Sequence, residues 1–200
     1  GSVCDAEDTA KLLGELPMPV FGAAAHDLFG AGEGKLSLPF KSLLKFDPTF
    51  GPSEAQTTGD CVAHATRNAI DVTRAVEIDI DGQREDFVAR GATEAIYQSR
   101  PWSEQGMTCS GAARYVSEQG GILIRKDYGM VDLSVYNSKL GARKMIPRQI
   151  YGNEAQKHQV KTVSNIRTVE EARDALANGY ALGVCSGYGF SSRRDKNGIA

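Results

Sequence analysis

The sequence is short of the residues that mark several common classes of site. Its 200 residues include only three histidines and four cysteines, and no two cysteines form a C-x-x-C pair. This spacing excludes zinc ribbons and thioredoxin-type redox motifs, and no cluster of His, Asp and Glu has metal-site spacing. No phosphate-binding loop is present either. We therefore expect no metal or other cofactor, and we expect Cys109 and Cys185 to be buried thiols.

Net charge and long apolar runs are also scarce. The formal net charge of −2 gives no electrostatic reason to expect nucleic acid or an anionic membrane as a partner. No apolar run approaches the ~18 residues of a membrane span, and the N-terminal region lacks the basic segment of a signal peptide. The cellular compartment stays undetermined. The apolar content of 41% is typical of a globular protein that buries a core.

Hydrophobic periodicity predicts three helices in the first part of the chain. From Cys61 onward, apolar residues recur at steps of three and four, which is one stripe of a helix. The opposite face of this helix carries Arg67, Asn68, Asp71 and Arg74. Two further helices are predicted over 92–100 and 109–119, and the second ends at a Gly-Gly pair.

Alternating and β-rich segments predict strands in three places. The segment VEIDIDG predicts a strand over 76–80 with a tight turn, and further strands are predicted over 158–166 and 180–190. Between the last two, Thr168 and Glu171 have the spacing of a capping box and predict the start of a helix. Residues 1–37, rich in Gly and Ala, predict an N-terminal arm that is either a surface leader or a docking segment.

The stretch QTTGDCVAHATRNAIDV carries a resemblance to a known family. Gln56, Gly59 and Cys61 resemble the oxyanion-hole and nucleophile segment Q-x-x-x-G-x-C-W-A of papain-like cysteine proteases. Other segments of that family, in the same order, are similar to further stretches of this chain. These stretches are LPFKSLLKFDPTFGPSEAQ before it, and EAIYQSR, EQGMTCSGAARYVSEQGGILIRKDYG and TVEEARDALANGYALGVCSGYGF after it. The resemblance covers 38–200. It departs from the family at Val62, where a Trp is usual, and in a Gln-to-Cys step that is one residue short.

The resemblance implies an α+β fold with two lobes. In this interpretation the arm at 1–37 precedes a helical lobe at 38–125, and a β-rich lobe begins at 126–200 and is incomplete at its C-terminus. Cys61 would be the nucleophile of a thiol-dependent peptidase, and Gln56 would belong to the oxyanion hole. A peptide or protein is then the expected substrate.

Three consecutive residues fall where the family has a Gly-rich strip that pairs with the substrate backbone. These residues are Gly106, Met107 and Thr108. The alternative interpretation is a plain turn before a helix.

The chemistry expected at Cys61 follows from its place at a helix N-terminus. Unpaired N–H groups and the helix dipole favour a thiolate there. The Cys61 N–H and the Gln56 amide would hold the oxyanion. Asp60 would stabilise the helix as its N-cap, but its charge would oppose the thiolate.

The general base is missing from this pattern. His64 lies one helical turn after Cys61, and its direction on the helix prevents it from approaching the sulfur, so we expect a core histidine. His158 and His26 are weaker candidates. We expect the base to lie beyond Ala200 or on another chain, and a continuation, the arm or a neighbouring subunit to cover the edge of the β-rich lobe.

Two other functions fit the same residues. The chain could be a non-catalytic papain-like module that serves as a structural or binding part of a larger assembly. It could also be another thiol enzyme of that group, such as an amidase or transglutaminase.

Overall fold

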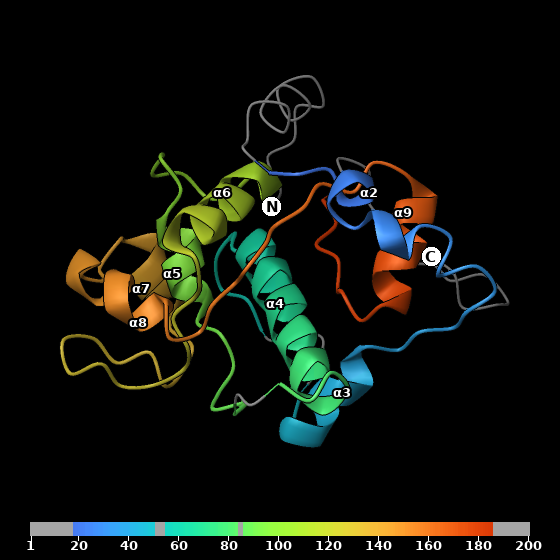
Figure 1. Ribbon diagram of the computed structural model, residues 1–200. Helices are drawn as coiled ribbons and strands as arrows, with labels where there is room; N and C mark the ends of the chain where they lie inside the picture. The colour runs from blue at the N-terminus through green and yellow to red at the C-terminus, as the bar shows by residue number, and fades with distance from the viewer. Residues whose placement is uncertain (1–17, 51–54, 84–85, 186–200) are drawn as a thin grey trace, which may run out of the picture.

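The computed structural model describes residues 18–50, 55–83 and 86–185, and these contain helices joined by irregular segments. Figure 1 shows their arrangement around one long helix, α4. The helices are α2 (Phe21–Ala24), α3 (Phe40–Phe46), α4 (Cys61–Asp79), α5 (Thr93–Gln98), α6 (Cys109–Gln119), α7 (Ser138–Ala142), α8 (Tyr151–Ala155) and α9 (Val169–Ala177), with two 3-10 turns, η1 (His26–Leu28) and η2 (Arg148–Ile150).

The predicted two-lobed α+β fold is wrong for the described residues, because they contain no β-strand and no sheet. Within 126–185, where the β-rich lobe was expected, the regular elements are α7, η2, α8 and α9. Residues 158–166 and 180–185 are not helical, but pairing at the first segment is limited to isolated bridges such as Gly121 with Gln159. An extended segment becomes a strand only where a neighbouring backbone pairs along its length. The end of the predicted strand, 186–190, lies outside the described residues.

The strand predicted over 76–80 is also wrong, since α4 continues to Asp79. Val76 fits both periods, because it lies on the helical stripe and begins the alternating segment. Val76 is buried on that stripe, whereas Ile80 is 68% exposed. Burial on one helical face therefore outweighs the local preference of the β-branched residues for a strand.

The core is built around α4 (Figure 1). Near its start, Val62 and Ala63 pack in the main apolar cluster with residues of α5 and α6, such as Ile96 and Val116. Further along, Val72 and Ala75 form a smaller cluster with Leu43 of α3. α7 packs on α5, and α8 packs on α6. The first turns of α4 therefore pack against α5 and α6, and its later turns pack against α3.

Three of the predicted helices are confirmed as α5, α6 and α9. α6 ends at Gly120, whose φ of 65° is the left-handed conformation of a glycine C-cap. α9 begins after Thr168, whose hydroxyl accepts a hydrogen bond from the Glu171 N–H. Across the part of the chain that the structure describes, no helix is long and apolar enough to cross a membrane.

The described part of the predicted arm packs against α9. The backbone N–H of Gly22 donates to Glu171, and those of Gly30 and Gly32 donate to the buried Asp174. Residues 1–17 lie outside the described part of the chain, so the division into arm and lobes stays a prediction.

Cys109 and Cys185 form a disulfide, so the prediction that both are buried thiols is wrong. The bond joins the first residue of α6 to the segment that follows α9, across 76 positions of sequence. Cys61 is the free cysteine of the described residues.

Candidate thiol site at the start of α4

Cys61 is the first residue of α4, as the sequence predicted. Its side chain is partly exposed, packs against the main apolar cluster, and carries a free thiol. α4 has 19 residues, so its aligned peptide dipoles place a partial positive charge beside the sulfur. The thiol therefore stands at the positive end of the helix dipole and remains accessible to a reagent.

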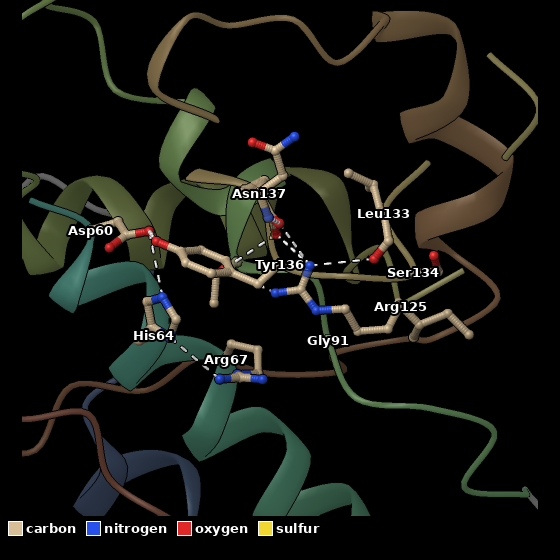
Figure 2. Close-up of polar contacts among 12 residues, drawn as sticks. Asp60, His64, Arg67, Gly91, Arg125, Leu133, Ser134, Tyr136 and Asn137 are labelled. Carbon is tan, nitrogen blue, oxygen red and sulfur yellow. Dashed lines mark hydrogen bonds and ion pairs between the residues drawn. The ribbon is translucent and has the colours of Figure 1, made fainter. Parts of the chain in front are cut away.

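Asp60 occupies the N-cap position, but its side chain caps nothing. The carboxylate is 1% exposed. Its Oδ2 accepts a hydrogen bond of 2.7 Å from the Tyr136 hydroxyl and lies 3.4 Å from Nε2 of His64 (Figure 2). The expected cap contact is therefore wrong, because Tyr136 and His64 engage the carboxylate instead.

His64 is buried, as expected for a core histidine. Its ring meets the Tyr136 ring edge-on at 5.1 Å between centroids, and its Nδ1 lies 3.4 Å from Nη2 of Arg67. This imidazole is thus placed among Asp60, Tyr136 and Arg67 (Figure 2). Its contacts are those of a structural residue.

A stripe of charged residues continues along α4 and is buried. Its members follow each other at steps of four and three: Asp60, His64, Arg67, Asp71 and Arg74. The sequence interpretation placed Arg67, Asp71 and Arg74 on the face opposite the core, and it was wrong. The segment around Gly91 covers this face, because both carboxylate oxygens of Asp71 accept its N–H, at 3.0 and 3.1 Å.

Gly91 allows this cover because it has no side chain. A Cβ there would lie 2.6 Å from Cδ1 of Ile122 and 2.8 Å from Cγ of Arg67. Burial raises the pKa of Asp71 to about 6, although the positive charge of Arg67 and the Gly91 N–H act in the opposite direction.

The loop before α7 brings Tyr136 to Asp60. Asn137, next to Tyr136, donates its backbone N–H to the buried Glu94 at 2.7 Å. Glu94 also binds Arg125 at 2.8 and 2.6 Å, and the Arg125 guanidinium lies 5.8 Å from the centre of the Tyr136 ring. Figure 2 shows Arg125 beside Tyr136 and the neighbouring residues of its loop. A buried ion pair therefore fixes the position of Tyr136.

The Tyr136 hydroxyl is a donor to Asp60 over the whole useful pH range. Burial, together with the hydrogen bond to Asp60 and its negative charge, raises the pKa of Tyr136 well above its usual value, while hydrogen bonding with Thr57 opposes this. The phenol therefore keeps its proton.

Gln56 lies in the irregular segment before α4 and is exposed. The next residue, Thr57, has its hydroxyl 2.6 Å from the hydroxyl of Ser138, so the start of α7, just after Tyr136, also holds the segment that carries Gln56. The role of Gln56 in an oxyanion hole stays a prediction.

Residues Gly106 to Thr108 make contacts typical of a turn before a helix. The Gly106 N–H donates to the Tyr97 hydroxyl at 3.3 Å, and its carbonyl accepts from the Trp102 indole at 3.2 Å. The Met107 side chain is buried. Thr108 caps α6 by accepting the N–H of Gly111. Their substrate-binding role stays a prediction, and these contacts favour the alternative.

The other two histidines lie elsewhere. Nδ1 of His158 is 3.5 Å from Nη2 of Arg74, and Arg74 is 13 positions after Cys61, about 20 Å along the helix. Burial, and then the charges of Arg74 and Lys126, lower the pKa of His158 to about 4. His26 is an exposed residue of η1 beside Asp27. His158 is therefore not placed as a base for Cys61.

Sequence reasoning missed Tyr136, Glu94 and Arg125. The buried stripe of α4 did carry a signal, since its charges have helical spacing, but nothing in that spacing identifies a partner 76 positions away. Within the described ranges, no group of three or more His, Cys, Asp or Glu side chains could hold a metal ion. No protein-family model, curated protein or solved structure matches the chain, so the candidate site rests on the geometry around Cys61.

Proposed function

We propose that the chain carries the nucleophile of a cysteine peptidase. Cys61 attacks the carbonyl carbon of a peptide bond, and the Cys61 N–H and the Gln56 amide bind the oxyanion that forms. The observation that carries the proposal is a free, partly exposed thiol at the start of a 19-residue helix, beside an N-cap carboxylate that does not cap. The papain-like resemblance supports the same roles.

A base from outside the described residues, or from another chain, completes the reaction. It takes the thiol proton and later returns it to the leaving amine. His64 is engaged with Asp60, and His158 lies near the far end of α4. The 200-residue chain alone is therefore expected to hydrolyse peptides no faster than its Cys61→Ala variant.

The second candidate is a non-catalytic structural or binding module. The burial of His64 and the distance to His158 favour it, because they leave Cys61 without a base among the histidines of the described ranges. The two candidates differ in one property. A peptidase site binds the oxyanion of a peptide adduct of Cys61, and a non-catalytic module does not.

A peptide aldehyde tests the proposal, because its thiol adduct forms an oxyanion without needing a leaving group. In a Cys4→Ser background, we expect the aldehyde to bind reversibly and to protect Cys61 from alkylation by iodoacetamide. Gln56→Ala should weaken aldehyde binding by about 10²- to 10³-fold, the size of the usual effect of losing one oxyanion donor. Alkylation by iodoacetamide forms no oxyanion, so Gln56→Ala should change the alkylation rate of Cys61 by less than about twofold.

Cys61→Ala is the control and should abolish both reactions. Aldehyde binding that is absent, or unaffected by Gln56→Ala, would contradict the peptidase proposal and favour the non-catalytic module. Thr58→Ala is a matched neighbour, since it removes a nearby side chain of the same segment without removing the amide.

A further inference from the structure

We propose that Tyr136 is a positioning residue for the Cys61 thiolate, which it serves by engaging the Asp60 carboxylate so that it does not cap the N-terminus of α4. The inference rests on the proposed function in so far as Cys61 is the nucleophile. It adds a residue from a distant loop that controls how readily the thiol ionises.

The starting point is a side chain that does not do what its position favours. Asp is among the best N-cap residues, because its carboxylate accepts the N–H of the second or third helical residue. In α4 those residues are Val62 and Ala63. A carboxylate bound to either N–H group would place a negative charge close to the Cys61 sulfur. A charge within about 4–6 Å disfavours a second charge of the same sign. A capping Asp60 would therefore suppress the thiolate.

Tyr136 provides the contact that competes with capping. Its hydroxyl donates to Oδ2 of Asp60 at 2.7 Å, the shorter of the two contacts, since Nε2 of His64 lies at 3.4 Å from the same oxygen. Because the phenol keeps its proton, it presents a donor to the carboxylate at every pH at which the thiol titrates. The Asp60 carboxylate thus takes its hydrogen bond from Tyr136 and not from the N–H groups of α4.

Charged groups lie behind both members of this pair. His64 faces Asp60 from α4, and Arg67 lies behind His64. Tyr136 faces Asp60 from the loop before α7, and Arg125 lies over the Tyr136 ring (Figure 2). The positive charges behind both partners help to keep a carboxylate in this place.

The loop itself is anchored, which makes Tyr136 a fixed donor. On its C-terminal side the Asn137 N–H binds Glu94, and on its N-terminal side the Leu133 carbonyl accepts from Arg125. Glu94 and Arg125 bind each other, so the loop is held at both ends by one buried ion pair. Because both ends of the loop are held, the Tyr136 hydroxyl stays in position to donate to Asp60.

The test is the alkylation rate of Cys61 with iodoacetamide as a function of pH, in the Cys4→Ser background. Tyr136→Phe should release Asp60 to cap α4 and slow alkylation at pH 7 by about three- to tenfold, with the midpoint of the pH profile moving upward. Tyr128→Phe is the matched control. Its hydroxyl bonds to the backbone of Ile124, so it removes a comparable contact and should leave the profile in place.

Asp60→Asn decides whether Tyr136 acts through the carboxylate. In the presence of Tyr136 this change should alter the rate by less than about threefold, and in the Tyr136→Phe background it should restore the original profile. The single Asp60→Asn variant keeps the inference testable if Tyr136→Phe does not fold. A large acceleration in that single variant would show that the carboxylate already acts on the thiol, and would overturn the inference.

An unchanged profile in Tyr136→Phe, or a slowed rate that Asp60→Asn does not restore, would equally overturn it. These readouts use alkylation alone. Failure of the peptidase proposal appears instead in the aldehyde and Gln56→Ala measurements, so the two can fail separately.

Discussion

Asp71 has no exposed surface, yet it carries a carboxyl group into the middle of α4. Its partners are the Gly91 N–H and, at 3.9 Å, Nε of Arg67. These contacts do not fully offset the loss of water, since the pKa of Asp71 is raised to about 6. The carboxylate is therefore a buried charge that folding tolerates at a cost.

This raised pKa predicts how the stability of the protein depends on pH. The folded state holds the Asp71 proton up to about pH 6, whereas the unfolded chain releases it near 3.8. The contribution of Asp71 to stability is therefore present at low pH and is lost as the pH rises through 6. From pH 7 to pH 5 the free energy of unfolding should increase by about 1 kcal/mol relative to Asp71→Asn.

Urea unfolding of both proteins at pH 5, 6 and 7 measures this difference. The comparison with Asp71→Asn matters because His158, whose pKa is lowered to about 4, acts in the opposite direction in both proteins. A difference between the two proteins that is flat, or that grows toward pH 7, would contradict the assignment.

At this scale the sequence predicts positions better than contacts. It places Cys61 at the start of a helix and His64 in the core, but it assigns Arg67 and Asp71, which share the buried face of His64, to the opposite side of α4. It does not predict that Asp60 turns to Tyr136, because the competing partner comes from a loop that only the tertiary structure brings near. It also does not predict that the segment around Gly91 covers Arg67 and Asp71, because only the tertiary structure brings that segment near α4.

α9 illustrates an element whose start is encoded locally. The Thr168 hydroxyl accepts the Glu171 N–H at 3.1 Å, and Oε2 of Glu171 accepts the N–H of Arg167 at 2.7 Å. The other oxygen of Glu171 accepts the Gly22 N–H from α2. One capping arrangement therefore begins α9 and attaches the N-terminal segment to it.

Thr168→Ala should lower the free energy of unfolding by about 1 kcal/mol, the usual cost of losing an N-cap side chain. Thr66→Ala is the control, because its hydroxyl donates to the Val62 carbonyl inside α4 and caps nothing. Alanine also suits a helix interior better than threonine, so this change should be neutral or slightly stabilising. Equal losses in the two variants would contradict a capping role.

The same contrast explains which elements the sequence predicts. Helices such as α5, α6 and α9 depend on hydrogen bonds within the element and on caps a few residues away, so a short window contains most of their signal. The extended segments at 158–166 and 180–185 carry the composition of strands, but a strand also needs a partner backbone. In the described ranges the first of these segments finds only isolated bridges, and the second none.

For the whole molecule, the disulfide between Cys109 and Cys185 is the longest-range covalent constraint in the described residues. It connects α6, which packs on α4, to the segment that leaves α9. The same segment is held by the Thr73 hydroxyl, which accepts the Ala181 N–H, and by the Tyr180 ring against Phe21. Ala181 also packs against the cluster of Val72 and Ala75, and the disulfide adds a covalent link to these contacts.

Cys109→Ser with Cys185→Ser should therefore lower the free energy of unfolding by about 4.5 kcal/mol, the chain-entropy estimate for a bond that closes a loop of this length. Urea unfolding with and without dithiothreitol measures it: the oxidised parent protein should lose a similar amount on reduction, whereas the double variant should not respond. Cys61→Ser is the matched control, because it removes a thiol that forms no bond and should leave the response to the reductant intact. If the parent protein is equally stable in both conditions, the segment after α9 is held by its non-covalent contacts, and the bond adds no constraint that folding depends on.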